Sequence, residues 1–583
     1  MSRNLAIALT ASLLALFTTL MLAGAGADTR IAEAAMNRDR DAVRSLIKQA
    51  VDVNTSQGDG MTALHWAALN GDVEIAQVLI NAGANVKATT RLGAYTPLFM
   101  AAKAGFPKVV DMLLKSGADA KAPALDGITS LMMAASAGSA ETVRLLVDAG
   151  ADVNAMETER GQTPLSFAAA FNQPDAVKTL LHYGADVNKK SKPMKPASRP
   201  QRGPQQGQQQ GQQQGQQTQG QQQGQQQAAQ PARGQQPPTP QAQGQQTQGQ
   251  QVQGQQAQGA RGGQRGQGQG QGQDESSRGG GNPRGELTPL MYAARQHNFE
   301  ASRALVEGGA RLNEVSGDLS TALLLATING AFDVAKYLVD RGADVNMASM
   351  DGASPLFGVV NTQWAPKTDT PQPTTKYEKI HYLELMKSML DRGADPNFRL
   401  RKDVWYTQNK ESTSSAGTTP FWRCAQVGDI DCMRLLHSRG ADPRISNIDG
   451  ITPLLVASGA GFHGNNELTT PFGRLATVQY LVEELHADVN VADTAEGSPR
   501  NDTMNTARAA GGFSALHNAA ARGDNVMIMY LVSKGAKVDA VARNGTTVVD
   551  MANGPRQRIQ PYRDTVALLE MLGATNSHKC VSC

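Results

Sequence analysis

Cysteines near the C-terminus are the side chains in this sequence whose spacing most directly suggests chemistry. Cys580 and Cys583 form a C-x-x-C pair in the tail 578–583, a spacing typical of a disulfide or redox pair. C-x-x-C followed by His is the signature of covalent haem attachment, and no His follows Cys583 in this sequence. We therefore expect no cofactor. Haem c is expected only if the natural chain continues, and electron transfer by a C-terminal cytochrome region is then the alternative function.

The remaining cysteines and two histidines point to structure rather than to catalysis. Cys424 and Cys432 stand at small or apolar positions of helical patterns. They are either buried apolar residues or a disulfide formed in an oxidising compartment. His65 and His517 lack a nucleophile or carboxylate at a spacing that would complete a catalytic set. No phosphate-binding glycine loop or H-E-x-x-H motif occurs. We expect no enzyme activity and no metal site.

Charge is distributed unevenly along the chain. The 583 residues carry a net charge of +3, which excludes a strongly basic nucleic-acid binder as a whole. Residues 191–284 contain nine Lys/Arg and two Asp/Glu among Gln, Gly and Pro. With almost no apolar residues to bury, this insert is expected to be disordered. Its Arg-Gly segments are able to attract a polyanion, but without interleaved aromatic residues we favour a solvated tract and expect no nucleic-acid partner.

The N-terminus has the features of an export signal. Arg3 precedes an apolar run from Leu5 to Leu22, and Ala25-Gly26-Ala27 supplies the small residues of a cleavage site. We predict a signal peptide over residues 1–27 that is removed after Ala27. The alternative is an uncleaved membrane anchor. No later run is long enough to span a bilayer, so we expect an exported protein, periplasmic or secreted, with no membrane span after cleavage.

Internal repetition determines the predicted fold. A T-P-L motif or a close variant recurs, mostly at spacings of 33 or 34 residues, and a second motif such as Gly150-Ala151-Asp152-Val153-Asn154 follows most copies by about twenty residues. The first motif begins at Thr62, Thr96, Thr129, Thr163, Thr288, Thr321, Ser354, Thr419, Thr452, Ser514 and Thr547. Residues 61–86 carry both motifs almost in full. This pair of motifs resembles the ankyrin repeat.

The residues themselves predict a two-helix unit. Thr is able to cap the first helix, and Pro suits its first position. A following Gly is expected to end that helix in a left-handed turn, as at Gly71, Gly105, Gly138, Gly330 and Gly428. A unit of this size cannot bury its own apolar faces, so units must stack into a solenoid. We predict an all-α ankyrin-repeat solenoid of twelve units, with a capping unit and four more in 28–190 and seven in 285–577.

The insert leaves open whether there are one or two arrays. Closing a loop of this length costs roughly 4 kcal/mol, whereas an interface between repeats that buries about 500 Å² of apolar surface contributes roughly 12 kcal/mol. We therefore favour one continuous stack over two separate arrays. Shorter insertions are predicted near residues 361–378, 399–416, 461–474 and 492–510.

The resemblance also implies a function. Ankyrin repeats bind proteins through a concave surface formed by turn tips and first helices, so we expect a monomeric exported scaffold with a protein partner. It further implies that His65 and His517 hydrogen-bond between neighbouring turns. For Trp66, Phe99 and Trp422, packing between repeats is an equal alternative to partner contact. Transferred by position, the candidate partner-binding residues are Met61, Trp66, Leu69, Asn70, Tyr95, Phe99, Lys103, Ile128, Gln162, Leu287, Arg295, Trp422 and Ile451.

Overall fold

The computed structural model describes residues 28–194, 283–364, 375–404, 413–460, 473–494, 511–554 and 561–578. Helices dominate these ranges and occur as twelve consecutive pairs, which we number as units 1 to 12. The pairs are α2 (Arg30–Met36) with α3 (Arg40–Lys48), α4 (Ala63–Asn70) with α5 (Val73–Asn81), α6 (Pro97–Ala104) with α7 (Pro107–Lys115), α8 (Ser130–Ala137) with α9 (Ala140–Asp148), α10 (Pro164–Ala170) with α11 (Pro174–His182), α13 (Pro289–Arg295) with α14 (Phe299–Glu307), α15 (Ala322–Asn329) with α16 (Phe332–Asp340), α17 (Pro355–Gln363) with α18 (Tyr382–Asp391), α19 (Pro420–Val427) with α20 (Ile430–His437), α21 (Pro453–Ala457) with α22 (Gly473–Gln479), α23 (Ala515–Ala520) with α24 (Asn525–Ser533), and α25 (Val548–Asn553) with α26 (Arg563–Met571).

Short elements complete this list. A 3-10 turn, η2 (Thr375–Tyr377), precedes α18, and a π-helical turn, η4 (Tyr480–Glu484), continues α22. Two strands, β1 (Pro193–Met194) and β2 (Arg284–Gly285), pair antiparallel. The prediction of a helical repeat fold with a helical unit before the first motif is confirmed.

The repeated motif begins and ends the first helix of each unit as its chemistry predicts. The Thr96 hydroxyl accepts a hydrogen bond from the Phe99 amide at 3.2 Å, which satisfies one of the free N–H groups at the helix start. Left-handed glycines end five of these helices, with φ between 69° and 84°. A side chain at such a residue would be strained. These glycines are Gly71, Gly105, Gly138, Gly330 and Gly428.

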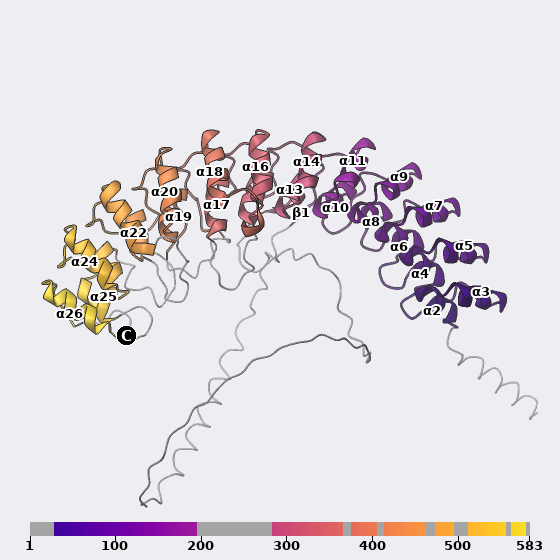
Figure 1. The fold of residues 1–583 in the computed structure, drawn as a ribbon, viewed down its shortest axis with the longest axis horizontal. Coiled ribbons are helices and arrows are strands. Elements are labelled where there is room, and N and C mark those ends of the chain that lie inside the picture. The colour runs from indigo at the N-terminus through magenta and orange to yellow at the C-terminus, as the bar shows by residue number, and fades with distance from the viewer. Residues whose placement is uncertain are drawn as a thin grey trace, which may run out of the picture. The chain divides into compact units, whose positions relative to one another are not determined.

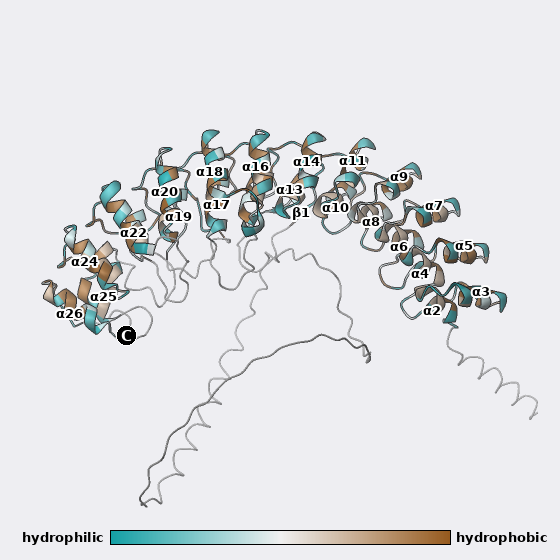
Figure 2. Ribbon diagram, viewed as in Figure 1, coloured by the Kyte–Doolittle hydropathy of each residue, from teal (hydrophilic) through white to brown (hydrophobic). Residues whose placement is uncertain are grey.

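Neighbouring units pack helix against like helix. First helices contact first helices, as in α4 with α6 and α6 with α8, and second helices contact second helices, as in α5 with α7 and α7 with α9 (Figure 1). Fully buried alanine pairs such as Ala67-Ala68 and Ala101-Ala102 allow the first helices this close approach. Second helices such as α16 and α18 carry both polar and apolar residues (Figure 2), as expected when one side faces the core. The core therefore runs between the two rows of helices.

Loops between units are joined by backbone and asparagine hydrogen bonds. Successive turn tips share a backbone bond, such as Arg91 N to Asp59 O and Leu125 N to Gly93 O. The last residue of the second motif adds a side-chain link: the Asn154 amide oxygen accepts from the Asp186 N–H at 2.8 Å, and its Nδ2 donates to the Gly184 carbonyl. One side chain thus satisfies two backbone groups of the next unit.

The same contacts connect the units on either side of the insert. Helix α10 contacts α13, and α11 contacts α14. Asn298 Nδ2 donates to the carbonyls of Ala169 and Ala170, at 2.8 and 2.9 Å. The Arg311 N–H donates to the Asn188 side chain at 2.9 Å, the link found between other neighbouring units. The favoured continuous stack is therefore what the structure shows for units 5 and 6.

The edges of the insert differ from the sequence prediction. We expected disorder over 191–284, but Ser191 is buried and exchanges hydrogen bonds with Leu287. Pro193 pairs with Gly285, and Met194 with Arg284. The four paired residues therefore extend the turn tip as a short antiparallel ladder. Residues 195–282 lie outside the described residues. The predicted disorder of that segment, like the signal peptide 1–27, lies outside the described residues.

The shorter insertions fall within or between units. Helix α17 continues to Gln363, three residues into the first predicted insertion, and the other predicted insertions lie partly outside the described residues. In the described ranges, none of the helices has the length and hydropathy required to cross a membrane.

Candidate functional site

Six first helices present an apolar residue at the same position of the repeat. The position is the fifth residue counted from the Thr that begins each motif. We call the six residues at this position the apolar line. Four of its members are half-buried, whereas Met100 and Tyr292 are more than nine-tenths buried. The line comprises Trp66, Met100, Met133, Phe167, Tyr292 and Leu325, on the first helices of units 2 to 7. Its accessible apolar surface therefore lies on units 2, 4, 5 and 7.

Trp66 was predicted from the sequence, and its surroundings are well ordered. Its indole Nε1 donates to the Gln57 side chain at 2.8 Å. The remaining members of the line were missed, although their shared register with Trp66 was a usable signal. Exposed leucines at two turn tips, Leu92 and Leu125, were also missed. Turn composition alone gave no reason to expect large apolar residues there.

Most sequence-predicted residues in units 2 to 6 remain accessible. Lys103 is exposed. The half-buried residues are Leu69, Asn70, Tyr95, Ile128, Gln162, Leu287 and Arg295. These residues and the apolar line lie on the first helices and the turns that precede them. Together they form the candidate surface.

Two of these accessible residues also make contacts within the array. Asn70 Nδ2 donates to the Ala35 and Met36 carbonyls of unit 1, so its side chain is partly used between units. The Tyr95 ring stacks on Phe99 at 4.5 Å, and burial raises the pKa of its hydroxyl. Tyr95 is therefore a neutral, partly apolar contributor to the surface.

Four predicted contact residues are buried and must be removed from the candidate set. Met61, Phe99, Trp422 and Ile451 each expose 6 % or less of their surface. The Trp422 indole donates to the Ile451 carbonyl of the next unit at 2.8 Å. For Phe99 and Trp422 the alternative of packing between repeats is correct, because their apolar rings are enclosed by the array.

Units 8 to 11 differ from units 2 to 7 at the apolar-line position. Its residues there are Gly358, Arg423, Val456 and Asn518, and all four are buried. The Arg423 guanidinium donates to the Gln426 side chain and to the Trp364 carbonyl. The accessible part of the first-helix row is therefore confined to units 2 to 7.

The two repeat histidines are structural, as expected. His65 is fully buried. Its Nδ1 lies 3.2 Å from the Thr62 amide, which must donate to it, and Nε2 then donates to the Tyr95 carbonyl at 3.0 Å. Burial lowers the pKa of His65. Hydrogen bonds with the Tyr95 and Ala88 backbone raise this pKa by a smaller amount. His517 repeats the contact to its own cap, Ser514.

The cysteines fall into two groups. Cys424 and Cys432 join α19 to α20 through a disulfide and are fully buried, which decides between the two sequence alternatives. Cys580 and Cys583, with their redox or haem alternative, lie outside the described residues. Across the ranges that the structure describes, no group of three His, Cys, Asp or Glu side chains is placed to hold a metal ion.

Ankyrin-repeat models match much of the chain. A three-copy model matches residues 31–124, 117–191 and 271–349, and a single-repeat model matches 416–448 and 511–543. Together these matches cover more than half of the sequence. The helix pairs of units 8, 10 and 12 lie outside the matched ranges, yet they have the same architecture.

Curated relatives match only part of the chain. Protein phosphatase 1 regulatory subunit 27 of Mus musculus is 33 % identical over 84 residues, 14 % of this chain and 54 % of that protein. A 26S proteasome non-ATPase regulatory subunit 10 of Dictyostelium discoideum is 38 % identical over 78 residues, 13 % of this chain and 34 % of that protein. Ankyrin repeat protein nuc-2 of Neurospora crassa is 25 % identical over 185 residues, 32 % of this chain and 14 % of that protein.

The chain thus spans about half of the length of the first of these relatives and smaller shares of the other two. The repeat architecture that the models match serves protein interaction. The recurrent motifs, the stacked helix pairs and the matched models show that this chain belongs to the ankyrin-repeat family.

Proposed function

We propose that this chain is an exported, monomeric scaffold that binds a protein partner through the first helices and turn tips of units 2 to 7, without catalysis or a cofactor of its own. The observation that carries the proposal is the apolar line. Its half-buried members Trp66, Met133, Phe167 and Leu325, with the exposed Leu92 and Leu125 at the turn tips, leave apolar surface open on this side of the array. Accessible apolar surface of this kind is typical of interaction sites. Relatives named as regulatory subunits of larger enzymes support a role in protein binding.

The surface suits a partner with apolar anchors. Trp66, Phe167 and Tyr95 belong to the residue types that dominate binding energy in protein interfaces. Each sits on a helix or a capped turn held by neighbouring units. A surface that is already ordered loses little conformational freedom when a partner binds. We therefore expect a few aromatic and methionine side chains to account for most of the affinity.

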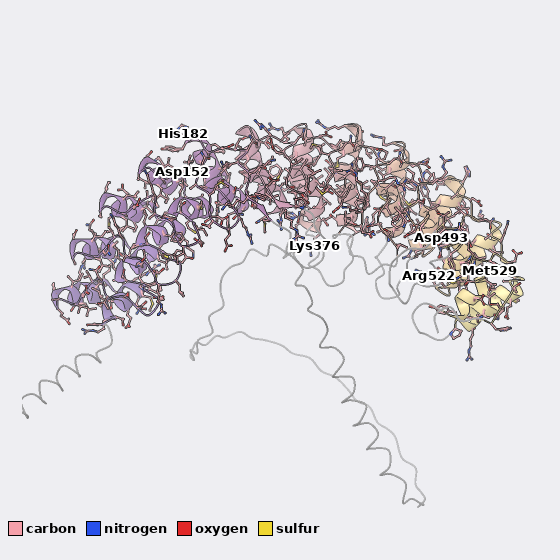
Figure 3. All side chains as sticks on the ribbon, turned by 180° about the vertical axis from the view of Figure 1, so that it is seen from behind. Asp152, His182, Lys376, Asp493, Arg522 and Met529 are labelled. Atoms are coloured by element: carbon pink, nitrogen blue, oxygen red, sulfur yellow. A yellow bond between two sulfur atoms is a disulfide. The ribbon has the colours of Figure 1, made fainter. Side chains whose placement is uncertain are left out.

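Matched methionine variants test this surface. A partner is first identified by cross-linking to the mature chain in the exported fraction, and its affinity is then measured by titration. Met133→Ala removes a side chain of the apolar line, and Met529→Ala removes an exposed methionine of α24 (Figure 3). Met133→Ala should weaken binding roughly tenfold or more, whereas Met529→Ala should leave it within about twofold.

Melting curves of both variants separate binding from folding. If Met133→Ala melts near the parent temperature and binds the captured partner as tightly as the parent and Met529→Ala do, units 2 to 7 are not the binding surface.

Export is the second part of the proposal. The leader and the buried disulfide between Cys424 and Cys432 support it, since disulfides persist mainly in oxidising compartments. N-terminal sequencing of the protein from the periplasm or medium should begin at Asp28. Recovery of full-length chain, with Met1 retained, only from the soluble cytoplasmic fraction would contradict export.

A further inference from the structure

The turn of unit 8 is longer than the two- or three-residue turns of units 1 to 7 and contacts both of its neighbours. Residues 375–380, which we call the strap, comprise η2 and the three residues before His381. Figure 3 labels Lys376, which belongs to this strap. The strap lies before α18, yet its side-chain contacts are with the corresponding turns of units 6 and 7.

Glu378 fastens the strap to both preceding units. One carboxylate oxygen lies 2.8 Å from His297 Nδ1 in the turn of unit 6, and the other accepts the Asp333 N–H of unit 7 at 2.8 Å. Asp333 returns the contact, because its carboxylate accepts the Lys379 and Ile380 amides at 3.0 and 2.9 Å. The Glu378 side chain is only 10 % exposed. Both carboxylates therefore act as links between units.

His297 occupies the position at which many units use glycine, although unit 1 has Arg38 and unit 5 has Asn172 there. Its φ is 61°, in the left-handed region, where glycine avoids the steric cost that a side chain brings. Gly330 holds the equivalent place in unit 7.

Both ring nitrogens of His297 face acceptors. Nε2 lies 2.9 Å from the Asn329 carbonyl, and Nδ1 faces the Glu378 carboxylate. A carbonyl cannot donate, and an ionised carboxylate cannot donate either. A neutral imidazole has one N–H and is able to donate to only one of these two acceptors. Donating to both requires a second proton. With Glu378 ionised, that proton is on the ring.

The other side of the long turn is fastened without a histidine. Trp364 Nε1 and the Tyr382 hydroxyl both donate to the same carboxylate oxygen of Asp429, each at 2.7 Å. Asp429 also caps α20 by accepting the Cys432 N–H. This forward contact joins unit 8 to unit 9 and serves as an internal comparison.

Charged residues flank His297 and Glu378 along the chain. Arg295 ends α13, Glu300 lies in the first turn of α14, Asp333 lies in the first turn of α16, and Lys376, Lys379 and His381 lie in or next to the strap. The imidazole forms an ion pair with Glu378 when the ring is protonated. Histidine is the group in this set whose charge ordinarily changes nearest to physiological pH.

We propose that the strap is a proton-dependent clip that holds units 6, 7 and 8 together. It is closed while His297 carries both protons and Glu378 is ionised. Removing the ring proton leaves either the Glu378 carboxylate or the Asn329 carbonyl without a donor, so the link between unit 6 and the strap is weakened. The contacts of the strap with Asp333, and those of Trp364 and Tyr382 with Asp429, remain. The strap is then held less firmly at higher pH while the array stays folded.

Hydrogen exchange of the mature full-length chain, read by mass spectrometry on peptides that cover 375–381, tests the clip. Rates are compared at about pH 5.5 and about pH 8.5, after correction for intrinsic exchange, across the range in which histidine titrates. We expect strap protection to fall roughly tenfold at the higher pH, because a hydrogen bond to a charged group is lost. Peptides at the start of α20 should keep their protection at both values.

His297→Gly is the informative variant. Glycine suits the left-handed turn, so the array should melt no lower than the parent while strap protection is low and independent of pH. Glu378→Gln should likewise abolish the pH dependence, because the ionised acceptor is removed. Unchanged strap protection in His297→Gly, or a parent strap that exchanges equally at both pH values, overturns the proposal.

Discussion

Histidines show how one residue type serves different purposes in this array. His65 is enclosed, and its two nitrogens meet one donor and one acceptor, which suits the neutral ring. His297 is partly exposed and meets two acceptors, which suits the charged ring. The difference follows from the partners that neighbouring units supply.

The buried ring of His65 makes stability depend on pH. Because burial lowers its pKa in the folded state, the unfolded chain binds a proton more readily. The stabilising contribution is complete above the ordinary histidine pKa of about 6.5 and is lost as the pH falls toward the folded value. His65→Gln keeps a side-chain acceptor for the Thr62 amide and cannot titrate in this range.

We therefore expect the free energy of unfolding to fall more steeply for the parent than for His65→Gln between about pH 7.5 and about pH 5. Urea titrations at several pH values provide the measurement. Parallel pH profiles for the two proteins would show that His65 protonation does not contribute.

At the scale of elements, the strands and the buried Ser191 define where the folded array stops and the insert begins. Sequence composition changes at residue 191, but the hydrogen bonds between Ser191 and Leu287 and the β1–β2 ladder belong to the turn tip. A deletion chosen by composition therefore removes Ser191 and the ladder, whereas a deletion of 195–282 leaves every described residue in place.

Two deletions test this boundary. Replacing 195–282 by a six-residue Gly/Ser linker should raise the free energy of unfolding by about 2 kcal/mol, because a much shorter loop must be closed. Replacing 191–284 by the same linker should give a smaller gain or a loss, since the Ser191 contacts and the ladder disappear. Thermal and urea melts compare the two, and equal stability would contradict the assigned boundary.

At the scale of the molecule, the stack passes from unit 5 to unit 6 without a break in its packing. Repeat arrays owe their stability to interfaces between neighbours, and this interface has the same helix contacts and the same asparagine link as others in the array. The two halves are therefore joined by more than the chain that connects them.

Proteolysis provides the test of that continuity. A protease that cuts within 195–282 should yield two fragments that elute together on a sizing column. Asn298→Ala removes two hydrogen bonds to Ala169 and Ala170, so the nicked variant should separate at a lower denaturant concentration than the nicked parent. Fragments of the parent that separate in buffer would instead indicate two independent arrays.

Much of this protein could be predicted from its sequence, because the repeat is local in its chemistry. Thr caps, Pro at the first helical position and left-handed Gly act within a few residues of one another, so their recurrence, with the capping unit before Thr62, predicted twelve two-helix units. The interior roles of His65 and of the alanine pairs followed from the same register.

Burial and long-range contacts were decided only by the tertiary structure. Met61 and Ile451 share a repeat position with residues that remain half-buried, such as Tyr95 and Ile128, and their enclosure depends on the side chains that adjacent units bring against them. Phe99 and Trp422 instead hold the same motif position as the buried His65. The contacts of Glu378 with His297 and Asp333 join residues 81 and 45 positions apart. The sequence by itself determined the repeating unit, because each unit is specified by neighbours along the chain. The accessible surface and the clip arise between units, where stacking brings distant residues together and no local pattern records the contact.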